Sequence, residues 1–200
     1  MNIEETHKFL EYKIESARGD TRSRPEVVRA DLCRAYRTAK NRADELLREA
    51  EAAITRQERA LRRKAFVAKS GADRVDARYR LDAADRAAMI EDPREAVELM
   101  RWAEDQGDEV LAAALAQRAY DQARMVSRIG KDTGWSTVLS EYTAERPAVR
   151  ETLDQLAEVP DLTNPAHRMQ IAMRYSVPKP SEIDSLSDGE INRLADSSED

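Results

Sequence analysis

Side chains that could bind a metal are few in this chain and lie far apart in sequence. The two histidines are His7 and His167. His7 lies three residues after Glu4 and four before Glu11, so all three could share one helical face as weak metal ligands. Because such spacing is common on solvated helices, we predict no metal site there. His167 has no second histidine or cysteine nearby, and we expect it to lie at a helix start or an interface.

Cys33 is the single cysteine of the chain, which excludes an intramolecular disulfide bond and a zinc site built from thiolates. Arg29, Arg34 and Arg37 lie close to it in sequence and could lower the pKa of its thiol. No histidine accompanies it as a base. We therefore predict a packed thiol in a reduced compartment.

Acidic pairs are the remaining candidates for acid–base chemistry. Asp82 with Asp85, and Glu104 with Asp105, would need surroundings that raise a carboxyl pKa, and the neighbouring sequence supplies none. We expect them to solubilise exposed helices. The sequence also lacks a glycine-rich phosphate loop and the short motifs of serine hydrolases and zinc peptidases. These observations predict a protein that is not an enzyme and uses no cofactor.

The composition predicts an all-α fold with a thin core. Alanine, glutamate, lysine, leucine and arginine make up 100 of the 200 residues, a proportion typical of long helices and coiled coils. Leucine, isoleucine, valine and phenylalanine total only 36, because much of the apolar content is alanine, which buries little surface. We therefore expect another chain to complete part of the apolar surface.

The element that must position a binding surface is a long helix predicted over residues 25–69. Pro25 suits its first position, and Ser70-Gly71 is the first plausible interruption. Small or apolar side chains recur along it with a mean step of about 3.7 residues, which favours a nearly straight pair of helices. We call the following row the seam and predict that it mediates self-association: Val28, Leu32, Ala35, Ala39, Ala43, Leu46, Ala50, Ala53 and Leu61.

Other helices are predicted over residues 2–18 and 72–90, and the second of these could fold back along the long helix. Caps and prolines mark later helix starts at Asp92-Pro93, Gly107-Asp108 and Asn164-Pro165. The large aromatic residues of this half are expected in the core. They are Trp102, Trp135, Tyr142 and Tyr175. The predicted domains are an extended helical arm, a hairpin or coiled-coil-like element (1–90), a small irregular helical bundle (91–176), and an extended linker with an acidic tail (177–200).

A basic stretch between residues 54 and 80 is the strongest candidate for a charged binding site. It carries nine basic side chains against three acidic ones. Contact with nucleic-acid phosphates is one interpretation. We favour contact with an acidic protein partner, including the tail of a neighbouring copy. The basic residues are Arg56, Arg59, Arg62, Arg63, Lys64, Lys69, Arg74, Arg78 and Arg80.

The last twenty residues have the opposite charge. They hold seven acidic residues and one basic one, whereas residues 1–90 hold 21 basic against 16 acidic, a polarity that favours contacts between front and tail. The tail composition is typical of disorder. Ser187 and Glu190 could nevertheless cap a short helix that orders on a partner. The apolar residues that would dock are Ile183, Leu186, Ile191 and Leu194.

The charged alanine- and arginine-rich arm, the Gly107-Asp108 corner and the Pro178-Lys179-Pro180 exit resemble small helical proteins of phage and prophage morphogenesis clusters in GC-rich bacteria. This resemblance implies a scaffold-like or head-associated structural protein that self-assembles through helices and contacts a shell protein through a terminal segment. Such scaffolds usually end in a basic docking segment, whereas this chain ends acidic.

The expected partners are proteins, above all further copies of the chain and a shell or other structural protein, and nucleic acid is the alternative. No apolar run approaches the roughly 20 residues needed to cross a bilayer, and residues 1–10 lack a secretory leader. We therefore expect no membrane partner, and a cytoplasmic location or, if the resemblance holds, a virion.

Overall fold

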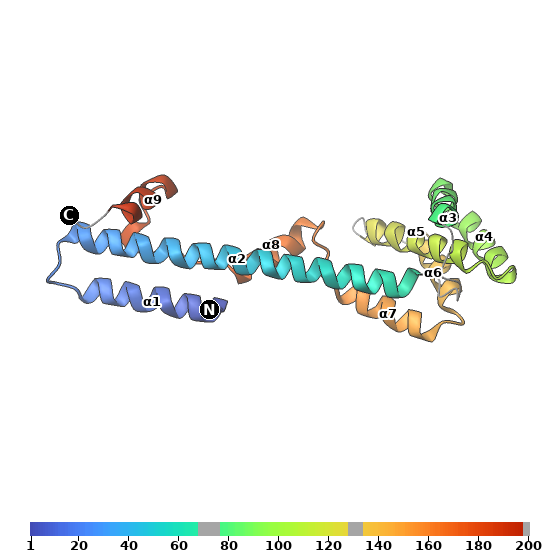
Figure 1. Ribbon diagram of the computed structural model, residues 1–200, viewed down its shortest axis with the longest axis horizontal. Coiled ribbons are helices and arrows are strands. Elements are labelled where there is room, and N and C mark those ends of the chain that lie inside the picture. The colour runs from blue at the N-terminus through green and yellow to red at the C-terminus, as the bar shows by residue number, and fades with distance from the viewer. Residues whose placement is uncertain (68–76, 128–133, 198–200) are drawn as a thin grey trace. The chain divides into compact units, whose positions relative to one another are not determined.

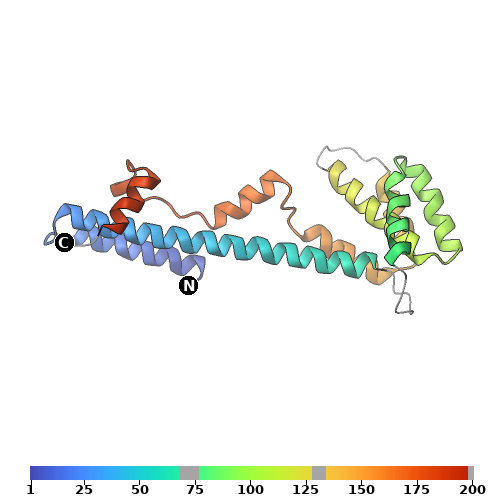
Figure 2. The ribbon, with the colours of Figure 1, turned by 45° about the horizontal axis from the view of Figure 1, so that its top comes forward.

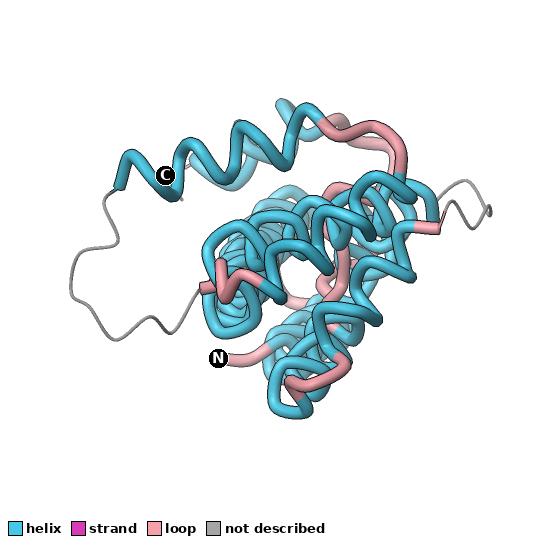
Figure 3. Tube along the Cα trace, turned by 90° about the vertical axis from the view of Figure 1, so that its right-hand side faces the viewer, coloured by secondary structure: helices cyan, strands magenta, loops and turns pink. Residues whose placement is uncertain are grey.

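The computed structural model describes residues 1–67, 77–127 and 134–197, and all regular structure within these ranges is helical. Figure 1 shows the elements along the chain, and Figure 3 shows the described segments as helix or loop. The predicted all-α class is therefore confirmed. The helices of these ranges are α1 (Ile3–Gly19), α2 (Pro25–Phe66), α3 (Ala77–Met89), α4 (Pro93–Asp105), α5 (Glu109–Ser127), α6 (Trp135–Thr143), α7 (Pro147–Glu158), α8 (Pro165–Arg174), the 3-10 turn η1 (Ser181–Ile183) and α9 (Asp188–Asp196).

Helix starts follow the caps that the sequence predicts. The side chain of Asp92 accepts a hydrogen bond from the backbone of Arg94 at 2.8 Å, and Pro93 occupies the first turn of α4. Asn164 caps α8 in the same way. Ser187 and Glu190 form a reciprocal capping box at α9. Each cap satisfies backbone N–H groups that have no partner inside the helix.

Contacts divide the chain into two compact units that differ from the predicted domains. The first unit combines residues 1–55 with 160–200, and the second spans residues 56–159. The predicted divisions at residues 90 and 176 therefore do not match, for two reasons. The end of α2 shares a core with the helices that follow it, and the chain after Val159 returns to the first unit.

The second unit is a bundle of α3 to α7 with the end of α2, built around alanine and a few large side chains. Met100, Leu111, Leu115 and Leu156 are almost completely buried. Among the expected core aromatics, Trp135 and Tyr142 are buried, but Trp102 is 48% exposed. Tyr175 lies outside this unit and is partly buried. Trp102 is not buried because its neighbour Ala103 faces the core, and successive residues of a helix point about 100° apart.

Helix α3 packs against α5, whereas the sequence leaves open that residues 72–90 could fold back along the long helix. Its buried face consists of Ala83 and Ala87, whose small side chains permit a close approach to the alanines of α5. Residues 72–76 of the predicted helix lie outside the described ranges.

The corner between α4 and α5 depends on Gly107, whose φ of +68° suits glycine and disfavours other residues. The backbone of Asp108 donates to the carbonyl of Ala103 at 2.8 Å, which closes the end of α4. The side chain of Asp108 then caps α5 by accepting from the backbone of Leu111 at 2.9 Å.

The first unit is held by a smaller core to which three distant segments contribute. Leu10 of α1, Leu32 and Tyr36 of α2, and Ile183 and Ile191 near the C-terminus are buried in one cluster. Both ribbon views show α1 and α9 beside the early part of α2 (Figure 1, Figure 2). Of the helices in the described residues, none is long and apolar enough to span a membrane.

Candidate interaction surface

The residues considered for catalysis and metal binding do not converge. The Nε2 atom of His7 lies 3.0 Å from the carbonyl oxygen of Ser176, and Glu4 pairs with Lys8 at 2.7 Å. His167 Nδ1 accepts a hydrogen bond from the backbone of Asp161 at 3.2 Å. Both histidines therefore tie segments of the first unit together. Within the described ranges, no group of three or more His, Cys, Asp or Glu residues is placed to hold a metal ion.

The other candidates also have structural surroundings. Cys33 is fully buried, and this burial raises the pKa of its thiol. The prediction of a packed thiol is therefore confirmed. Asp82 and Asp85 are exposed on α3. Glu104 forms a two-pronged ion pair with Arg146, with distances of 2.7 and 2.8 Å.

The seam on α2 changes from buried to exposed along its length. Four consecutive members are buried, with exposed fractions of 7% or less. They are Leu32, Ala35, Ala39 and Ala43. Val28 is partly buried before them, and Leu46 and Ala50 are partly buried after them. Ala53 is exposed. Leu61, the last member, belongs to the second unit and packs at the edge of its core.

Three of the buried seam residues lie in one apolar cluster with side chains of α1 and of residues 181–197, which we call the C-terminal segment. Ile183, Ile191 and Ala195 are buried in the same cluster as Leu32, Ala35 and Ala39 of α2. Leu186 and Leu194, the other predicted docking residues, pack partly buried at its edge. All four predicted tail residues thus contact the core of their own chain.

Charged contacts surround this apolar patch. Arg37 pairs with Asp196 at 2.5 Å and Lys40 pairs with Asp188 at 2.9 Å. The hydrogen bond and charge of Asp188 raise the pKa of Lys40, and Lys40 in turn lowers the pKa of Asp188. Ion pairs between basic residues of α2 and acidic residues of the C-terminal segment therefore attach this segment to the helix.

Further polar contacts hold the two ends of the C-terminal segment. Arg18 of α1 pairs with Glu182 at 2.6 Å, and this contact lowers the pKa of Glu182. At the other end, Arg34 donates to the carbonyl oxygen of Ser197 at 3.0 Å. Lys179 donates to the carbonyl oxygens of Asp184 and Leu186, which fixes the turn before α9.

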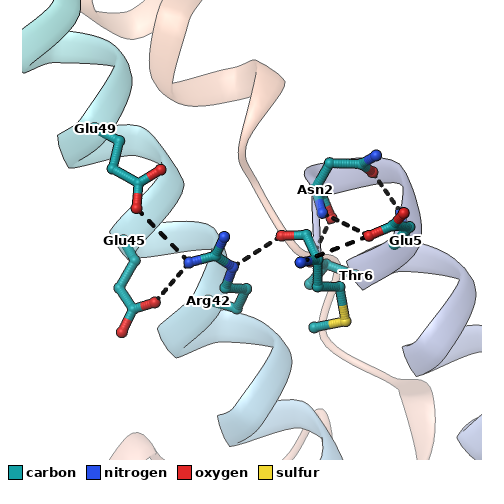
Figure 4. A network of polar contacts seen from close by, with 7 residues as sticks. Asn2, Glu5, Thr6, Arg42, Glu45 and Glu49 are labelled. Carbon is teal, nitrogen blue, oxygen red and sulfur yellow. Dashed lines mark hydrogen bonds and ion pairs between the residues drawn. The ribbon is translucent and has the colours of Figure 1, made fainter.

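A separate polar network joins α2 to the start of the chain (Figure 4). Arg42 donates from Nε to the carbonyl oxygen of Met1 at 2.9 Å. The same guanidinium contacts Glu45 at 2.9 Å and Glu49 at 3.7 Å. This network lies beside the buried Ala43, and beyond it the seam is no longer fully buried.

The basic stretch separates into an inward-facing part and an exposed part. Arg62 contacts Glu58 at 3.2 Å and Asp121 at 2.8 Å, and its guanidinium lies 5.0 Å from the ring centre of Tyr120. Arg124 reaches Glu58 at 2.5 Å. Arg62 is therefore part of the packing of the second unit. The exposed members are Arg56, Arg59, Arg63, Lys64, Arg78 and Arg80. Lys69 and Arg74 lie outside the described residues.

Sequence patterns do not identify the residues that hold the C-terminal segment. Arg18, Arg37 and Lys40 are ordinary helix-surface residues until their acidic partners are known. The signal present in the sequence is the opposite charge of residues 1–90 and of the last twenty residues. It predicts that the two segments contact each other, but it does not show which residues form ion pairs. No family model, curated protein or solved structure matches the chain, so this surface is characterised by its own geometry.

Proposed function

We propose that the protein is a non-enzymatic structural or assembly protein, as the resemblance to phage and prophage morphogenesis proteins implies, and that it self-associates through the uncovered part of the seam on α2. The observation that carries this proposal is the change in burial along one row of small residues. Ala39 and Ala43 are 0% and 2% exposed, whereas Ala53 is exposed on the same helix. Beyond residue 43 the row is no longer fully buried, so its remaining small side chains offer a surface to a second helix.

The chemistry of the uncovered part suits a helix as its partner. Leu46 and Ala50 precede Ala53 at helical spacing, and their side chains are partly buried. Small side chains let two helix backbones approach closely, and a leucine supplies apolar surface at the edge. Charged residues at the neighbouring positions, such as Arg48 and Glu49, would set the orientation of the partner.

A pair of adjacent alanines provides the test. Ala53→Glu would place a carboxylate inside the proposed helix–helix contact and should weaken self-association by at least about tenfold, because an unpaired buried charge is costly. Ala52→Glu is the control, since Ala52 is also exposed but lies off the seam. Both dissociation constants would be measured by sedimentation velocity over a dilution series. Equal effects of the two substitutions, or no effect of either, would contradict the proposal.

Nucleic-acid binding is a second candidate, supported by the arrangement of the exposed cations. Arg56, Arg59 and Arg63 are all exposed and are spaced by three and four residues, so they share one face of α2. Arg62 does not belong to this row, because it pairs with Asp121. Three aligned guanidinium groups could follow a phosphate backbone.

This second candidate predicts binding that is controlled by salt. Fluorescence anisotropy with a labelled DNA duplex should show affinity that falls as salt rises, with a log–log slope of roughly −2 to −3 for three phosphate contacts. Changing Arg56, Arg59 and Arg63 to glutamate should abolish binding. Binding that survives these changes, or that is absent at low salt, would remove this candidate.

A further inference from the structure

A half-open cavity of about 420 Å³ lies in the second unit, where the end of α2, α3 and α5 meet. Phe66 of α2 and Val110 of α5 contribute apolar surface to it, and much of the remaining wall is alanine. Alanine side chains end at Cβ, so facing rows of alanine leave space that larger side chains would fill. Sites that bind small molecules typically have volumes of about 300–1,000 Å³ and a mainly apolar lining. The alanines of the wall are Ala84, Ala87 and Ala88 of α3 and Ala113 and Ala114 of α5.

The cavity wall also carries positive charge. Arg80 of α3 and Arg118 of α5 belong to it, together with the carboxylate of Asp121. Asp121 pairs with Arg62 at 2.8 Å, so its negative charge is already compensated. Among the ion pairs of the described residues, none involves Arg80 or Arg118. The wall therefore attracts an anion.

Arg118 differs from the other partly buried arginines that the structure describes in this unit. Arg62, Arg124 and Arg146 each pair with a glutamate. Arg118 instead contacts a neutral side chain. The amide oxygen of Gln122, in the orientation that satisfies both polar atoms of this amide, accepts hydrogen bonds from Arg118 at 2.8 and 3.1 Å.

The guanidinium of Arg118 is held in place while its charge stays unmatched. It lies 6.0 Å from the ring centre of Trp135, and its Nε atom is buried without a hydrogen-bond partner among the described residues. A guanidinium that is partly removed from water without an anion is costly. An anion in the cavity would compensate the charge of Arg118.

We propose that this cavity binds a small carboxylate with an aliphatic chain. The carboxylate pairs with Arg118, because hydrogen bonds between charged groups are roughly twice as strong as those between neutral groups. Arg80, which is exposed, adds attraction at the edge of the cavity, and the aliphatic chain lies against the alanines. A sugar would suit this wall poorly, because most of its hydroxyl groups would lose water without gaining a hydrogen-bond partner.

This site is separate from the seam. Its wall contains no seam residue and lies within residues 56–159, whereas Ala50 and Ala53 belong to the first unit. The inference therefore goes beyond the proposed self-association, and the two are tested independently.

Three probes distinguish the contributions of chain and charge when they are titrated into the full protein by isothermal titration calorimetry. Octanoate has both, 1-octanol has the chain alone, and acetate has the charge alone. Octanoate should bind at one site and at least about tenfold more tightly than either of the others. In NMR spectra, octanoate should shift the methyl signals of Ala84 and Ala114 and leave those of Ala50 and Ala53 in place.

Two substitutions test the two parts of the site. Arg118→Gln removes the charge, and Ala84→Phe fills the cavity without changing the charge. Each should weaken octanoate binding by at least about tenfold. The matched controls are Arg86→Gln and Ala77→Phe, because Arg86 and Ala77 are exposed on α3 and do not belong to the cavity wall. Both controls should bind octanoate as the unchanged chain does.

Several results would overturn the inference. They are the absence of saturable octanoate binding, equal affinities for octanoate and 1-octanol, methyl shifts that avoid Ala84 and Ala114, and an unchanged affinity in either cavity variant. If circular dichroism shows that Arg118→Gln unfolds the chain, Ala84→Phe and the comparison with 1-octanol decide.

Discussion

At the scale of single residues, leucines of the second unit differ in how much they stabilise the fold. Leu115 is 1% exposed in the core, whereas Leu81 is 63% exposed on α3. Leu115→Ala should lower the free energy of unfolding by about 2–5 kcal/mol, because it removes buried methyl groups and leaves a cavity. Leu81→Ala should change it by less than about 0.5 kcal/mol. Urea unfolding of both variants checks this, and equal losses would contradict the assigned core.

The acidic residues of the C-terminal segment predict how its attachment depends on pH. The pKa values of Asp188 and Glu182 are lowered below their ordinary values of 3.8 and 4.5 by hydrogen bonds from Lys40 and Arg18. A lowered folded-state pKa means that the stabilisation is complete above the ordinary value and is lost as pH falls below it. We expect the attachment to have its full strength at pH 6 and to weaken as the pH falls through this acidic range, while the buried Ile183 and Ile191 continue to hold the segment.

Amide hydrogen exchange measured by NMR can follow this weakening of the attachment. Protection in α9 should fall when the pH drops below about 4, once intrinsic exchange rates are corrected, whereas protection in α5 should change less. Simultaneous loss in both helices would show that acid unfolds the whole chain instead of releasing one segment.

Residue-level predictions from sequence succeed where a local property decides the outcome. The packed state of Cys33 follows from the absence of a partner base. The exposure of Trp102 could not be predicted in the same way, because Trp102 and Ala103 are neighbours and only the packing of α4 decides which of them faces the core.

At the scale of elements, the corner at Gly107 is a sensitive point. Its φ of +68° is costly for a residue with a Cβ atom, although a Cβ there would meet no other atom within 4 Å. Gly107→Ala should therefore destabilise the second unit by about 1 kcal/mol through backbone strain alone. Gly19, at the end of α1, also has open space and no such φ.

The matched substitution Gly19→Ala isolates this conformational effect. It should be neutral or slightly stabilising, because alanine restricts the unfolded chain more than glycine does. Thermal unfolding of both variants gives the comparison. Similar melting temperatures for the two variants would argue against strain at the α4–α5 corner.

Much of the helix order could be predicted from sequence because helix starts carry local signals. Pro25, Pro93 and Pro165 each begin a helix at the predicted position. The direction in which α3 packs has no such signal, since an alanine face fits several neighbours equally well. From the sequence, α3 could return along the long helix, and the structure places it against α5.

At the scale of the whole chain, pairing between distant segments limits what the sequence can predict. The charge difference between front and tail indicates that the two attract each other. It does not show that Asp188 meets Lys40 of the same chain, 148 positions away. The same applies to Arg62, which belongs to the basic stretch in sequence but pairs with Asp121 in the second unit.

The seam shows what helical periodicity can and cannot predict. Its nine positions follow from helical periodicity, but periodicity cannot say which of them a segment of the same chain covers. The structure shows that the four seam members from Leu32 to Ala43 are buried within the first unit, and this leaves Leu46, Ala50 and Ala53 as the part on which the proposed association depends. The surface available to a partner is therefore shorter than the predicted row.

The most direct test of the proposed function is the mass of the full chain in solution. Sedimentation equilibrium should give a weight-average mass that exceeds the 22.7 kDa of one chain and rises with concentration. A mass that stays at that of one chain at every concentration and salt would contradict self-association through α2.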